Sequence, residues 1–133
     1  METHLDWDQL VDALRGELQE KGDLLRLLNQ QTETLYRRDP VENERLEEQM
    51  SAQLRLISRC TKHREAVFQQ IASRFQLDDH ASANDVILRF PDYVHPLLEA
   101  LVTEVDRLSN RVDERLKQNQ DLKERFFSQA PAV

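Results

Sequence analysis

Apolar side chains recur along most of this chain at alternating steps of four and three residues, the spacing that places them on one side of an α-helix. The most regular example runs from Tyr93 to Phe127, where only Arg115 and Asn119 interrupt the apolar seam. The positions in register are Val94, Leu98, Leu101, Val105, Leu108, Val112, Arg115, Asn119, Leu122 and Phe126. The pattern predicts a long amphipathic helix that organises the rest of the fold.

Two earlier segments carry the same spacing, the first from Asp6 to about Arg38 and the second from Pro40 to about Phe75. Between them Asp39 is placed to cap a helix that Pro40 opens, with Glu42 at the position of a capping-box acid. A single kinked helix is the alternative. Glu17 and Lys21 are four residues apart in the first segment and are interpreted as a pair on the helix surface.

The segment from Gln76 to Ala83 has no periodicity and is predicted to be the main connection. Ser82 and Asp85 form a capping signal for a short helix that Pro91 ends, Asp92 is placed to cap the last long helix, and Pro96 falls in its opening turn. We therefore expect an all-α protein, an antiparallel bundle of three long helices with a short extra helix before the last. Residues 1–127 should form a single domain, followed by a loose tail at 128–133.

Composition and charge narrow the functional classes. Charged residues make up 32% of the 133 residues and the formal net charge is −7, with no basic run, which argues against a nucleic-acid partner. Cys60 is the single cysteine and occupies a seam position, where a cysteine usually behaves as a small buried hydrophobe. No segment has the ~18 uninterrupted apolar residues of a membrane span, and the acidic N-terminus lacks the pattern of a secretory signal. A reducing cytoplasm is the expected compartment.

Catalytic patterns are weak. Both glycines lie within predicted helices, so no phosphate-binding loop is expected, and there is no nucleophile elbow. His95 and Glu99 share a helical face without a third ligand nearby, and the run Asp78, Asp79 and His80 is best interpreted as a solvated loop. We predict a protein that is not an enzyme and uses no cofactor and no metal. Its apolar side chains exceed one stripe per helix, and Leu97, Leu116, Phe126 and Phe127 are candidates for an exposed strip, although they could equally close the core or a homodimer.

The order of parts resembles the FlgN-type flagellar export chaperones over roughly Leu10 to Phe127. A leucine-rich helix ends in the run Leu35-Tyr36-Arg37-Arg38-Asp39, and a Glu- and Gln-rich helix follows with Leu46, Met50, Leu54 and Ile57. After a variable loop comes a final helix with Leu98, Leu101 and Leu108 and the run Asn119-Gln120-Asp121-Leu122. This chain departs from the family in stopping soon after Phe127.

The resemblance implies a small cytoplasmic protein that binds the C-terminal helical segments of the two hook–filament junction proteins, prevents their premature assembly and delivers them to the flagellar type III export gate. Its binding region would be the C-terminal helix, here a partner strip of Leu108, Val112, Leu116, Asn119, Leu122 and Phe126. Asn119 could instead be a core residue that fixes register. The main alternative is a structural or adaptor coiled-coil protein that homo-oligomerises through the same strip.

Overall fold

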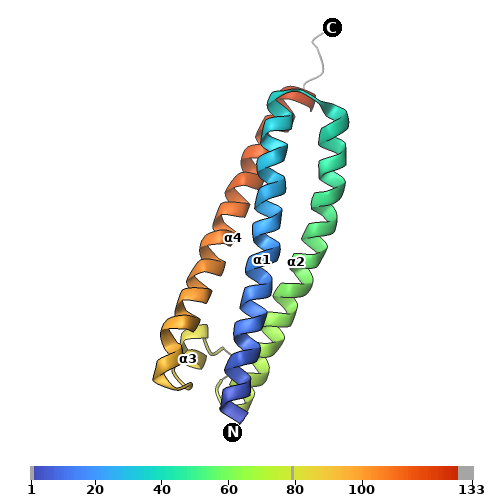
Figure 1. Ribbon diagram of the computed structural model, residues 1–133. Helices are drawn as coiled ribbons and strands as arrows, with labels where there is room; N and C mark the ends of the chain where they lie inside the picture. The colour runs from blue at the N-terminus through green and yellow to red at the C-terminus, as the bar shows by residue number, and fades with distance from the viewer. Residues whose placement is uncertain (1, 79, 129–133) are drawn as a thin grey trace.

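The computed structural model describes residues 2–78 and 80–128, and almost all of them are helical (Figure 1). The long helices are α1 (Glu2–Tyr36), α2 (Pro40–Arg74) and α4 (His95–Lys123). The short helix α3 (Ala83–Ile87) and a 3-10 turn, η1 (Asp92–Val94), precede α4, and a π-helical turn, η2 (Glu124–Ser128), follows it. The described ranges contain no strand, so the all-α class predicted from the sequence is confirmed.

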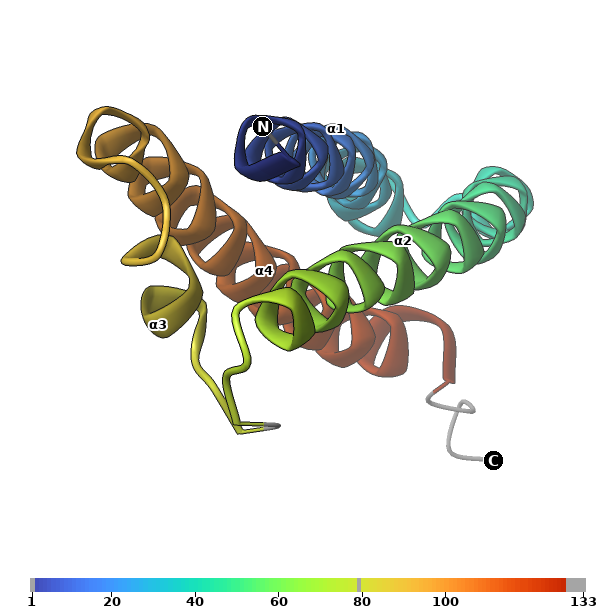
Figure 2. The ribbon, with the colours of Figure 1, turned by 90° about the horizontal axis from the view of Figure 1, so that it is seen from below.

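The three long helices form an up-down-up bundle in which α1 lies between α2 and α4 (Figure 1). The view along the bundle shows α3 beside the first turns of α4, at the end where the chain crosses over from α2 (Figure 2). The turn between α1 and α2 and the end of α4 lie together at the opposite end. The predicted antiparallel arrangement, with a short helix before the last long one, is therefore confirmed.

The break between α1 and α2 is a true reversal, so the alternative of one kinked helix is wrong. Arg38 has a left-handed backbone with φ of 55°, and the Asp39 carboxylate accepts a hydrogen bond from the Glu42 backbone N–H at 3.1 Å. Glu42 does not complete a capping box. Its carboxylate instead accepts hydrogen bonds from Arg45, while the Asp39 N–H is bonded to the carbonyl of Thr34 in the preceding helix.

The connection between α2 and α4 agrees only in part with the prediction from the sequence. Ser82 and Asp85 form the predicted capping box at the start of α3, and Pro96 lies in the first turn of α4. The prediction that Asp92 caps the last helix is wrong, because Asp92 begins the 3-10 turn and no side chain caps α4. The turn itself carries the chain into the helix through a bond from the Val94 N–H to the Pro91 carbonyl.

The last helix has a different end from the one predicted. Its α-helical part stops at Lys123, and residues 124–128 continue as the π-helical turn η2. Of the predicted loose tail, only Ser128 belongs to η2, and residues 129–133 lie outside the described residues. That residues 1–127 form one domain stays a prediction.

The apolar core is divided along the bundle. A larger cluster at the α3 end gathers residues of α1, α2, α3 and α4 around Leu14, Ile71 and Leu98. A smaller cluster nearer the other end joins α1, α2 and α4 around Leu28, Leu46 and Val112. In the middle of α2 the spacing of four and three residues runs through Gln53, Ile57, Cys60 and Arg64, and these four side chains are only half-buried. Polar side chains occupy the level between the clusters.

Candidate functional site: the C-terminal half of α4

The predicted partner strip lies on the C-terminal half of α4 and on η2, and its residues differ in exposure. Val112 and Asn119 are buried in the bundle. Leu108, Leu122 and Phe126 are half-buried, as is Leu116, which packs against the smaller cluster. Buried and half-buried positions alternate along this part of the helix. The half-buried side chains therefore form an apolar border beside the buried residues of α4.

Asn119 is held by α1 through both ends of its amide. Its Nδ2 donates to the Leu28 carbonyl and to Gln31 Oε1, each at 2.9 Å, and its Oδ1 accepts from the Thr32 hydroxyl at 2.7 Å. Gln31 in turn donates to Asn43 of α2 at 3.1 Å. Both N–H groups of Asn119 are therefore used inside the bundle. This is the environment of a core residue that fixes the register of α4 against α1.

Phe126 closes the strip at the turn between α1 and α2. Its ring lies 5.7 Å from the ring of Tyr36, centroid to centroid, and the Arg38 guanidinium carbon is 4.6 Å from the Phe126 centroid. A cation at this distance over an aromatic face is attracted by the ring quadrupole. This contact could not be predicted from the sequence, since nothing in a helical period links Arg38 to a residue at the other end of the chain.

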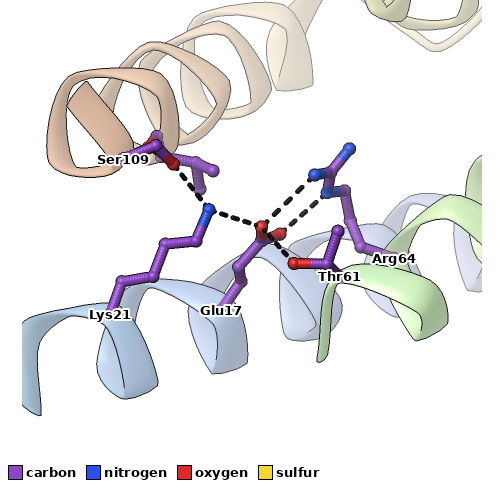
Figure 3. Close-up of polar contacts among 6 residues, drawn as sticks. Glu17, Lys21, Thr61, Arg64 and Ser109 are labelled. Carbon is purple, nitrogen blue, oxygen red and sulfur yellow. Dashed lines mark hydrogen bonds and ion pairs between the residues drawn. The ribbon is translucent and has the colours of Figure 1, made fainter. Parts of the chain in front are cut away.

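A buried ionic cluster ties the three long helices together at the level between the two apolar clusters (Figure 3). Glu17 of α1 has no exposed surface. Its carboxylate accepts from Arg64 Nε at 2.8 Å and from the Thr61 hydroxyl at 3.1 Å, and it lies 2.9 Å from Lys21 Nζ. Lys21 also donates to the Ser109 hydroxyl of α4.

The electrostatic balance at Glu17 favours the charged form. Burial alone raises the pKa of this carboxyl, but hydrogen bonds and attraction from Arg64 and Lys21 outweigh it and lower the pKa to about 2. The interpretation of Glu17 and Lys21 as a surface pair is therefore wrong. Lys21 and Arg64 fall in register with the apolar positions of their helices (Leu18 and Leu25, and Cys60 and Val67), and a cation in each of two apolar seams could have indicated a buried acid between them.

The other residues considered for metal binding or catalysis include two that form hydrogen bonds with nearby backbone groups. His95 Nε2 is 2.8 Å from the Phe90 carbonyl, and Asp78 accepts from the His80 backbone N–H, while Asp79 lies outside the described residues. Cys60 is half-buried rather than fully buried, and burial followed by the nearby Glu20 and Glu17 raises the pKa of its thiol. Across residues 2–78 and 80–128, no cluster of three or more His, Cys, Asp or Glu side chains is arranged to hold a metal ion.

A bundle of three long helices with an apolar border along the last one places the chain in the class of small all-α proteins. Within that class the chain belongs to the FlgN protein family, whose family model matches residues 1–130. FlgN proteins are flagellar export chaperones. No curated protein and no solved structure matches the chain. Among the described residues, no helix is long and apolar enough to cross a membrane.

Proposed function

We propose that this protein is a cytoplasmic chaperone that binds the C-terminal helices of the hook–filament junction proteins, prevents their premature assembly and delivers them to the export gate. The observation that carries the proposal is the apolar border of α4 formed by Leu108, Leu116, Leu122 and Phe126, which are half-buried in the isolated bundle. An amphipathic segment laid along this border would bury its own apolar face and could not pair with another subunit.

The two buried members of the strip have a supporting role in this proposal. Val112 and Asn119 fix α4 against α1, so that the leucines on either side stand at a constant spacing. A rigid surface of this kind loses less conformational entropy when a partner binds. The protein has a net charge of −7, so a partner segment with basic residues beside its apolar face would be favoured over an acidic one.

The test is a calorimetric titration with peptides from the C-terminal helices of the same organism's junction proteins. We expect saturable one-to-one binding that Leu122→Asp and Phe126→Asp each abolish, with the helical circular dichroism spectrum retained. Leu54→Asp is the matched control, because Leu54 is also a partly exposed leucine but lies on α2. Equal losses from Leu54→Asp and Leu122→Asp, or no binding of either peptide to the folded protein, would contradict the proposal.

A further inference from the structure

A hollow of about 690 Å³ lies between the last turns of α2 and the short helix α3. Figure 2 shows α3 across from the end of α2 and beside the first turns of α4. One wall of the hollow is a face of α2 from Arg64 to Gln76, and the other is formed by Ala83 and Val86 of α3 with residues of the connection between the two helices. We call this hollow the α3 groove.

The deeper lining of the α3 groove is apolar. Val86 of α3 is buried and belongs to the larger apolar cluster, and the half-buried side chains of Phe68, Ala72 and Leu77 pack against that cluster. The exposed lining residues of α2 are all polar. An apolar side chain that entered the groove would therefore extend the core of the bundle, and its polar neighbours would remain at the surface.

The α3 groove has the dimensions of a short helix. Its wall on α2, from Arg64 to Gln76, extends over ~18 Å of helix. Three turns of a second helix are ~16 Å long and ~10 Å across, so half of that cylinder has a volume of ~640 Å³. The groove, at about 690 Å³, is large enough to hold this half.

An extended segment fits the groove less well than a helix does. The backbone of an extended peptide needs hydrogen-bond partners, which binding sites of that kind supply from the edge of a sheet. Residues 2–78 and 80–128 contain no strand. A helix satisfies its backbone groups internally and presents only side chains to the groove.

The charges at the groove favour a basic partner. Arg64 lines the groove, but its guanidinium is turned toward the buried Glu17 and its charge is balanced there (Figure 3). Hydrogen bonds from Arg64 to Glu17 raise the pKa of Arg64 although burial opposes the rise, and the nearby acids Glu65 and Asp106 raise it further. Glu65 and Asp78 themselves line the groove. The lining is therefore acidic on balance, as is the whole protein.

We propose that the α3 groove is a docking site for an amphipathic α-helix of another protein, about three turns long, with Lys or Arg beside its apolar face. The apolar face would pack on Phe68, Ala72 and Val86. The basic residues would lie near Glu65 and Asp78, which gives the contact its electrostatic complementarity.

The α3 groove is separate from the partner strip. The groove lies at the α3 end of the bundle, whereas the strip runs along the C-terminal half of α4 toward the turn between α1 and α2 (Figure 1). A helix in the groove would leave the strip uncovered. The inference therefore goes beyond the function proposed above and does not depend on it.

An NMR titration of the ¹⁵N-labelled whole protein tests the docking. The probe is a capped peptide of Leu, Ala and Lys, about four helical turns long, with leucines on one face and lysines beside them. A contact of this length falls below the roughly 800 Å² per partner of a standard interface, so we expect a dissociation constant of roughly 100 μM. The amide signals of residues 64–78 and 81–87 should shift and saturate. Absence of these shifts at millimolar peptide would overturn the proposal.

Two control peptides separate the apolar face from the charge. A scrambled peptide has the same composition without an apolar face, and an acidic peptide has Glu in place of each Lys. Neither should shift the groove signals, because the first cannot bury leucines on Phe68 and Ala72 and the second is repelled by Glu65. Shifts with either control peptide equal to those with the probe would refute the proposal.

Steric and charge variants locate the contact. Ser73 is an exposed serine that lines the groove, and Ser73→Trp should fill the space and abolish the shifts. Glu65→Lys should weaken binding roughly tenfold, because an attraction is exchanged for a repulsion. Ser51→Trp and Glu48→Lys make the same changes at exposed positions of α2 outside the groove, and both should bind like the wild type. Full binding by Ser73→Trp, or equal losses in the controls, would contradict the assignment.

Two further measurements distinguish the groove from other contacts. Leu122→Asp, which alters the partner strip, should leave the groove shifts unchanged, and their loss in this variant would place the peptide on the strip and refute the proposal. Dilution of the protein without peptide should leave the groove signals in place. Their movement on dilution would show that a second copy of the chain fills the groove, and would refute the proposal as well.

Discussion

Arg64 of α2 lies with its Nε 2.8 Å from Oε2 of Glu17, a carboxylate of α1 that has no exposed surface. A second guanidinium hydrogen bond, from Nη2 to Oε1 at 3.2 Å, makes the pair bidentate. Lys21 forms an ion pair with the same carboxylate and donates a hydrogen bond to Ser109 of α4. Contacts around this one acid therefore connect all three long helices. A buried pair of this kind gives little net stability compared with apolar residues, but losing one partner is costly.

Arg64→Ala should therefore destabilise the protein by about 3 kcal/mol, because it leaves a buried carboxylate with only Lys21 as its charged partner. Urea unfolding followed by circular dichroism measures the change. The control is Arg107→Ala, which removes an exposed pair with Glu104 and should have little measurable effect. Equal effects of the two substitutions would mean that the buried cluster does not contribute as described.

Stability should depend on acid pH through Glu17. Its pKa is about 2 in the folded protein and 4.5 is the ordinary value, so the folded state binds the proton less readily than the unfolded state. The resulting stabilisation, on the order of 3 kcal/mol, is fully present above pH 5 and is lost as pH falls toward 2. Glu17→Gln should flatten the dependence in this window, measured as the free energy of unfolding at a series of pH values. An unchanged slope would contradict the assignment.

Asn119→Ala should cost about 2 kcal/mol, because it removes the buried donor to Gln31 Oε1 and the bonds of Asn119 with the Leu28 carbonyl and the Thr32 hydroxyl. Asn110→Ala, an exposed asparagine on the same helix, is the control and should change stability little. Amide hydrogen exchange adds a local test, since the α4 amides near residue 119 should lose more protection than those near Leu98. Uniform loss along α4 would argue against a local role for Asn119.

Gly22→Ala should stabilise the protein by about 1 kcal/mol, the difference in helix propensity between the two residues. A Cβ atom added at Gly22 would have no neighbour within 4 Å beyond the helix's own backbone, and the same holds at Gly16. The thermal unfolding midpoints of Gly16→Ala and Gly22→Ala should both rise, and their effects should add. A fall in either would show that the backbone at that site needs glycine for another reason.

Much of the fold could be predicted because helix periodicity and capping are local. Asp39 with Pro40, and Ser82 with Asp85, mark helix starts that hold in the structure, since a cap needs only its own next turn. The prediction that Asp92 caps the last helix was wrong because a 3-10 turn satisfies the same backbone donors without a side chain. The sequence could not distinguish these two ways of starting α4.

The candidate site was predictable in outline and not in detail. Periodicity placed Leu108, Val112 and Asn119 on one side of the last helix, but it could not say which of them face α1. That depends on the rotation of α4 in the bundle, which the hydrogen bonds of Asn119 with α1 help to fix. The contact of Arg38 with Phe126 joins residues far apart in the chain and has no local signal.

By itself, the sequence determined the helical class, the number and order of the helices, and the family to which the chain belongs. These depend on patterns that repeat within a few turns or along the whole chain. Only the tertiary structure decided that Glu17 is buried and that Asn119 is a core residue, because burial depends on what neighbouring helices place opposite a side chain. It also decided which charges pair between helices, as Lys123 of α4 does with Glu47 of α2.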